Sequence, residues 1–134
     1  NTKLKKGIFY KYRVRPYVNI GTGKAFGPWS NYNFFGVPTK STGKVSGRKI
    51  RYTWNKVAGA TKYTVYISAS SSSTGYKKVK SLKSNKRSIT LTKCGKKKLK
   101  KGKTYYVKVV VSGKSGKTKG TSKQFAYISP YISR

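Results

Sequence analysis

The chain has 134 residues, enough for one domain or slightly more, and it carries 33 lysines and arginines but no aspartate, glutamate or histidine. A protein of ordinary composition would have about 16 acidic residues at this length. General acid–base catalysis relies chiefly on the missing side chains, and metal sites need several ligands where this chain offers only Cys94. The composition therefore argues against an enzyme and against any metal or cofactor site.

Apolar content predicts a folded, soluble chain. Hydrophobic residues make up 35% and aromatic residues 14%, whereas a disordered basic tail would be poor in aromatics. The apolar runs are far shorter than the about 20 residues that cross a membrane, so we expect no membrane insertion. The single Cys94 excludes a disulfide framework within the chain, and we expect it to be a plain structural side chain.

The first predicted strand belongs to a repeated segment. Residues 4–7 (Leu-Lys-Lys-Gly) recur as residues 99–102, an offset of 95 residues. After each glycine the apolar side chains alternate with other residues, over 10–14 in the first copy and 105–111 in the second. A period of two predicts strands of a sheet that is covered on one face.

Further strands are predicted between the two copies. Apolar alternation occurs over 50–54 and 63–67, and shorter runs occur at 76–79 and 88–91. Glycine and serine residues break the chain between them, and no segment shows a sustained helical period. Several short strands about 8 to 12 residues apart, with turn residues between them, predict a β-sandwich or a small β-barrel.

Two motifs resemble fibronectin type III domains. Residues 54–66 (WNKVAGATKYTVY) resemble the region in which a tryptophan on strand B precedes a turn and strand C. Leu99 with Tyr105 resembles the corner between strands E and F, where a tyrosine hydrogen-bonds back across the turn. The resemblance implies an all-β, immunoglobulin-like sandwich.

Residues 99–106 (LKKGKTYY), with residues 75–79 (GYKKV) upstream, are similar to fibronectin type III repeats of large surface and secreted proteins of Gram-positive bacteria. The likeness implies one complete module at 44–129, preceded by strands F and G of another module at 1–38, with strand G starting at 27–31. Residues 39–43 would be a linker and 130–134 a tail. The family pattern further implies structural core roles for Trp29, Trp54, Tyr10, Tyr63, Leu99 and Tyr105. The chain departs from that pattern in its lack of acidic residues and in the Cys94-Gly95 insertion.

Two groups of residues are candidates for polyanion binding. The densest positive patch consists of Lys96, Lys97, Lys98, Lys100, Lys101 and Lys103, and such patches attract polyanions by releasing their counterions. Tyr66, Tyr106 and Lys108 are predicted on the outer face of the sheet, where rings and cations can stack on bases or sugars. The plain alternatives are a solvated loop and ordinary strand residues.

The hypothesis that follows is a non-catalytic module of an extracellular or cell-surface bacterial protein, acting as a spacer, adhesin or assembly unit. Its partners would be anionic cell-wall polymers or neighbouring modules, and self-assembly through edge strands is an open alternative. A second hypothesis is a binding protein for a polyanion, either nucleic acid or teichoic acid. A third is an accessory domain of a secreted enzyme.

Overall fold

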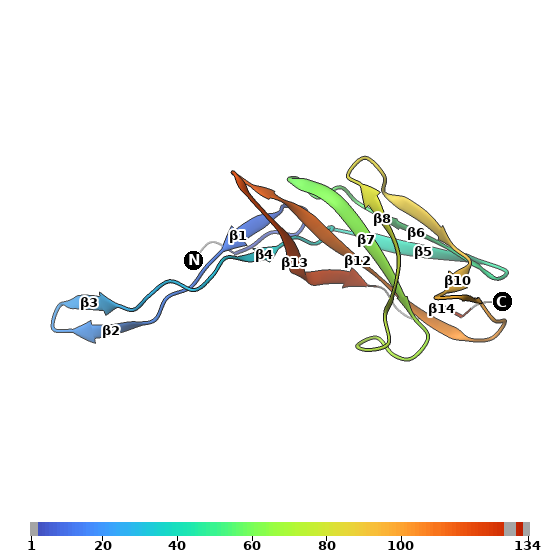
Figure 1. Cartoon of the computed structure of the whole chain (residues 1–134), viewed down its shortest axis with the longest axis horizontal. Helices are drawn as coiled ribbons and strands as arrows, with labels where there is room; N and C mark the ends of the chain where they lie inside the picture. Colours follow the sequence, from blue (N-terminus) through green and yellow to red (C-terminus); the bar gives the residue numbers. More distant parts are fainter. Residues whose placement is uncertain (1–2, 128–130, 133–134) are drawn as a thin grey trace.

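The structure is a computed structural model that describes residues 3–127, 131 and 132, with side chains described as far as Lys123. The described residues form β-strands joined by turns, and they contain no helix. A two-layered sandwich follows a long hairpin, which extends away from one end of the sandwich (Figure 1). The predicted all-β class is therefore confirmed.

The two layers of the sandwich are antiparallel sheets. One layer has the strand order β5-β6-β9, and the other has the order β13-β12-β7-β8 with β14 also paired to β12. The strand bounds are β5 Ser41–Ser46, β6 Lys49–Trp54, β7 Ala60–Ser68, β8 Lys77–Lys83, β9 Ser88–Leu91, β12 Thr104–Ser115, β13 Thr118–Tyr127 and β14 Tyr131–Ile132.

The ends of the sandwich differ from the predicted boundaries. β5 pairs with β6 from Ser41 onward, so residues 41–43 belong to the sheet and not to the predicted linker at 39–43. This edge strand shows almost no apolar alternation, which is why its start could not be read from the sequence. The predicted tail at 130–134 contains β14, which pairs with the start of β12. Residues 128–130, 133 and 134 lie outside the described part of the chain.

The core lies between the two layers. Successive side chains of a strand point to opposite faces, so each central strand buries every second residue. The residues that β6, β7 and β12 bury in this way, each at most 4% exposed, are Ile50, Tyr52, Trp54, Tyr63, Val65, Ile67, Tyr105, Val107, Val109 and Val111. The same cluster includes Leu91 on β9 and Leu99 in the loop before β12, together with Phe9 and Val57.

The hairpin is built from four short strands. β1 (Tyr10–Tyr12) pairs with β4 (Asn33–Phe35), and farther out β2 (Tyr17–Ile20) pairs with β3 (Gly23–Phe26). The expected strand start at 27–31 is wrong, because β3 already begins at Gly23 and residues 27–32 lie between β3 and β4. Pro28 lies in this interval and has no N–H for a sheet ladder.

The base of the hairpin is fixed to the sandwich. Phe9 is buried in the sandwich core, and its ring stacks on Phe34 with the centroids 5.8 Å apart. The Phe9 N–H donates to the Ala58 carbonyl oxygen at 2.8 Å, and the Ala58 N–H donates to the Gly7 carbonyl oxygen at 2.8 Å. A Cβ at position 113 would lie 2.8 Å from Phe9 Cγ, so Gly113 gives the ring its space. The hairpin is therefore joined to the sandwich by packing as well as by hydrogen bonds.

Candidate polyanion-binding surfaces

No cation of this chain has a carboxylate side chain to pair with. Aromatic rings take that place at several positions. Among the described residues, lysine and arginine groups lie 3.7 to 5.5 Å from ring centroids in eight pairs. These contacts gather in two regions, one on the hairpin and one on the outer face of the sheet that contains β12.

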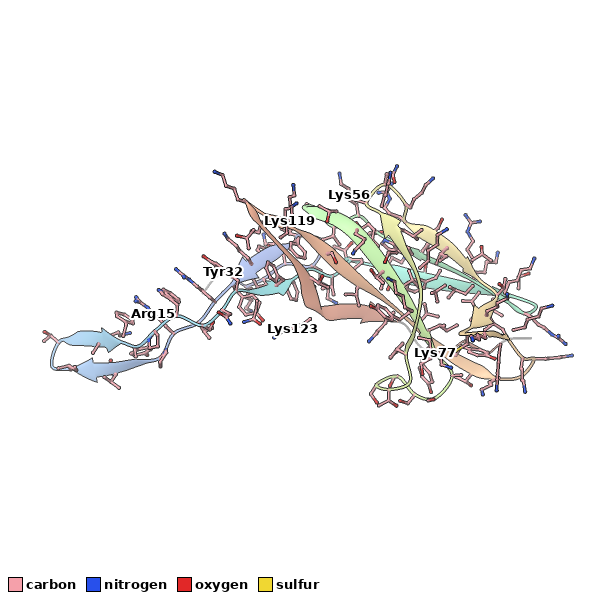
Figure 2. All side chains as sticks on the ribbon, viewed as in Figure 1. Arg15, Tyr32, Lys56, Lys77, Lys119 and Lys123 are labelled. Atoms are coloured by element: carbon pink, nitrogen blue, oxygen red, sulfur yellow. The ribbon has the colours of Figure 1, made fainter. Side chains whose placement is uncertain are left out.

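One face of the hairpin carries an alternating row of cations and rings, which we call the ladder. Trp29 lies between two guanidinium groups, 4.4 Å from Arg13 and 4.5 Å from Arg15. Arg15 also lies 3.7 Å from the Phe26 ring, and Arg13 lies 5.2 Å from the Tyr32 ring. Arg15 and Tyr32 lie along the same side of the hairpin (Figure 2). The row continues through Lys11 at one end and through Tyr17 and Lys24 at the other. This arrangement was not predicted from the sequence.

Trp29 is not a core residue, contrary to the prediction. Its side chain is 47% exposed, because Trp29 lies on the ladder face with the arginines. On the opposite face of the hairpin Tyr10 is half-buried, whereas Val14 is 62% exposed. The other predicted core residues, Trp54, Tyr63, Leu99 and Tyr105, are at most 4% exposed.

The six candidate lysines of the loop lie at the end of the sandwich remote from the hairpin (Figure 1). Two very short strands, β10 (Lys93–Cys94) and β11 (Lys97–Lys98), form a ribbon there, and Lys96 lies in its turn. The other three lysines precede β12, and all six are exposed.

Two hollows flank this ribbon. The corner hollow has a volume of about 240 Å³, and its cationic lining consists of Lys77, Lys97, Lys98, Lys100 and Lys103. The turn hollow, beside the β5–β6 turn, has a volume of about 410 Å³, and its cationic lining consists of Arg48, Lys49, Lys93 and Lys98. Lys98 therefore lines both hollows, whereas Lys96 and Lys101 line neither. Lys77, Arg48 and Lys49 were not predicted, because only the folded chain brings them to the ribbon. Lys93 lies in the ribbon itself and was also not predicted, because Cys94 and Gly95 separate it from the run of lysines.

The loop before β12 is held by a tyrosine corner. The Lys100 N–H donates to the hydroxyl oxygen of the buried Tyr105 at 2.9 Å. The same bond recurs 95 positions earlier, where the Lys5 N–H donates to the Tyr10 hydroxyl oxygen at 3.4 Å. Gly102, with a φ of +71°, lies in the turn, where a residue with a side chain would be strained. The corner fixes the backbone that carries the lysines of the corner hollow.

The second candidate group lies on the outer face of the β12 sheet. Lys108 on β12 faces the Tyr66 ring at 5.5 Å and the Tyr76 ring at 4.1 Å. Tyr76 precedes β8 and was not predicted. Burial lowers the pKa of the Lys108 ammonium below its ordinary value. Tyr106 lies on the same face two residues away and is half-buried. The ammonium of Lys108 is thus held against rings instead of standing out into solvent.

The described residues contain no group of three or more His, Cys, Asp or Glu residues that could hold a metal ion. Cys94 is a half-buried free thiol whose Sγ donates to the Ile67 carbonyl oxygen at 3.9 Å. Within the part of the chain that the structure describes, no helix has the length and apolar character needed to cross a membrane.

Comparison with solved structures supports the fold. The crystal structure of the chicken CNTN1 FN1-FN3 domains resembles this chain with a TM-score of 0.52 and 20% sequence identity. The match covers 92% of this chain and 41% of that one, so this chain spans less than half the length of that structure. No family model and no curated protein matches the chain. The chain thus has a fibronectin type III-like β-sandwich fold.

Proposed function

We propose that this chain is a non-catalytic spacer and adhesive module of an extracellular bacterial protein, and that its cationic surface meets anionic cell-wall polymers. The observation that carries the proposal is the charge: 33 cations and no acidic side chain on a β-sandwich scaffold. No side-chain ion pair can neutralise these cations within the chain. Binding to a polyanion would relieve their mutual repulsion.

The shape of the molecule supports a spacing role. The hairpin extends away from one end of the sandwich, and the densest lysine patch lies at the other end (Figure 1). The buried Phe9 and the hydrogen bonds at Ala58 fix the hairpin base to the sandwich. A module of this shape presents two distant surfaces to different neighbours. The recurrence of the tyrosine-corner bond in both halves supports a tandem arrangement of such units.

The proposal is tested by titrating the protein with a fluorescently labelled glycerol-phosphate polymer at 20 to 300 mM NaCl. Electrostatic binding predicts that log K falls linearly with log[NaCl], because each neutralised phosphate releases counterions. A neutral dextran of equal length is the control and is expected not to bind. Failure of the glycerol-phosphate polymer to bind at 20 mM NaCl would contradict the proposal.

The alternative function, nucleic-acid binding, is favoured by one observation. Tyr66, Tyr76 and Lys108 place two rings around a cation on the outer face, and rings can stack on unpaired bases. A single-stranded oligonucleotide with the same number of phosphates decides between the two functions. If the oligonucleotide binds about tenfold tighter and Tyr66→Ala removes the excess, the alternative is correct.

A further inference from the structure

We propose that one linear phosphate polymer binds in both hollows beside the β10–β11 ribbon and passes from one hollow to the other at Lys98, which lines both. This inference rests on the proposed function and deepens it, because it assigns the binding to one end of the sandwich. It also gives a role to the Cys94-Gly95 insertion, which lies in the ribbon and departs from the family pattern.

The fold gathers the cations of this site from four separate segments. The turn after β5 and the start of β6 supply Arg48 and Lys49, and the start of β8 supplies Lys77. The ribbon supplies Lys93, Lys97 and Lys98, and the loop before β12 supplies Lys100 and Lys103. The ribbon separates the two hollows, and Lys98 lines both. A ligand that fills both hollows must therefore be extended and must carry more than one anionic group.

The ribbon turn leaves room for one lysine of this site, and one hydrogen bond fixes the backbone of another before any ligand binds. The side chain of Lys77 crosses the ribbon turn at Gly95, where an added Cβ would lie 2.8 Å from Lys77 Cδ and 3.3 Å from Lys77 Nζ. Gly95 has a φ of +65° and no side chain, so the lysine can pass close to its backbone. The Tyr105 hydroxyl fixes the backbone at Lys100. Groups positioned in advance lose less conformational freedom when a ligand binds.

The lining of the hollows favours bare phosphate over nucleic acid. Sites for single-stranded nucleic acid combine cations with exposed rings on which bases stack. Tyr105 is the aromatic residue among those that line the two hollows, and it is 2% exposed. Lysine binds phosphate as a point charge, and the hydroxyl groups of Ser46, Ser70 and Thr92 add neutral hydrogen-bonding groups to the lining.

The test uses inorganic polyphosphate as the probe and two variants of equal charge. The site variant carries Lys97→Gln, Lys98→Gln, Lys100→Gln and Lys103→Gln. The control variant carries Lys114→Gln, Lys117→Gln, Lys119→Gln and Lys123→Gln on β12, β13 and their turn. Lys119 and Lys123 lie at the end of the sandwich nearer to the hairpin (Figure 2). Each variant loses four of the 33 cations, and all eight lysines are exposed.

We expect the site variant to bind polyphosphate at least about tenfold more weakly at 150 mM NaCl, with the slope of log K against log[NaCl] reduced by about three. The affinity of the control variant for polyphosphate should fall by less than about threefold under the same conditions. If the site variant with four substitutions does not fold, the single variants Lys98→Gln and Lys117→Gln are compared instead, and Lys98→Gln should lose more affinity for polyphosphate. Orthophosphate should bind more weakly than polyphosphate at equal phosphate concentration.

Three outcomes would overturn the inference. Equal losses in the two variants would show that overall charge and not this site governs binding, which leaves the proposed function standing. Tighter binding of a single-stranded oligonucleotide than of polyphosphate would show that bases contribute. Absence of polyphosphate and glycerol-phosphate binding to the unmodified protein would refute this inference and the proposed function together.

Discussion

Three tyrosine hydroxyls accept a backbone N–H from five or six residues earlier in the chain, and they differ in burial. Tyr63 accepts from Val57 at 2.9 Å within the core. Tyr105 accepts from Lys100 at 2.9 Å in a partly buried position, and Tyr10 accepts from Lys5 at 3.4 Å in an exposed position. Replacing each tyrosine by phenylalanine keeps the ring and removes only the oxygen that accepts the bond.

The more deeply buried the N–H that loses its partner, the larger the expected loss of unfolding free energy. A buried donor without a partner costs about 1–3 kcal/mol, so Tyr63→Phe should fall in that range. Tyr105→Phe should cost about 1 kcal/mol, because water reaches part of the loop. Tyr10→Phe should cost less than about 0.5 kcal/mol, since the Lys5 N–H can bond to water instead.

Urea unfolding at 25 °C, followed by tryptophan fluorescence, measures the three losses on one scale. The slope of free energy against urea should stay constant across the series, because none of the substitutions changes the surface exposed on unfolding. The reasoning is wrong if Tyr10→Phe costs as much as Tyr63→Phe, or if Tyr63→Phe leaves the midpoint unchanged.

Three further results are expected. Trp54→Ala should cost about 3–5 kcal/mol in urea unfolding, because Trp54 is 4% exposed and packs on Tyr52 and Tyr63, whereas Trp29→Ala should cost far less. The Tm should rise between 10 and 500 mM NaCl as salt screens the repulsion among the cations, and a steady fall would contradict this. Burial lowers the pKa of Lys108 in the folded state below its ordinary value of 10.5, so between the folded and unfolded pKa values the unfolded state binds more protons and the free energy of unfolding rises with pH. This rise should be smaller in Lys108→Met, and calorimetric scans at pH 8 to 10.5 measure the difference.

The central strands could be predicted because burial on one face imposes a period of two. Residues 50–54, 63–67 and 105–111 alternate for this reason, and each lies in a strand with the apolar residues inward. The start of β5 could not be predicted, because an edge strand that contributes only the half-buried Val45 to the core cluster carries little of this signal. The same holds for the two-residue strands of the ribbon, which are too short to show a period.

The candidate surfaces were predicted only in part, because sequence shows local clusters and not assembled ones. Six of the loop lysines were found by their density, and four of them line the corner hollow. Lys77, Arg48 and Lys49 join them only through the fold. Trp29 was assigned to the core by family pattern, and the ladder that exposes it depends on how the two arms of the hairpin are paired.

The ladder on the hairpin and the two hollows beside the ribbon are cationic through different side chains, arginines in the ladder and mainly lysines in the hollows. The ladder places Arg13 and Arg15 against rings, and a guanidinium is planar and weakly hydrated enough to stack there. The cations that line the two hollows beside the ribbon are almost all lysines, whose ammonium groups remain strongly hydrated point charges. In this chain without carboxylate side chains, the arginines of the hairpin make cation–π contacts with aromatic rings, and these contacts hold the two arms of the hairpin together. The lysines that line the two hollows beside the ribbon have no such ring contact among the described residues, so we expect this end of the sandwich to exchange counterions most readily for a phosphate polymer.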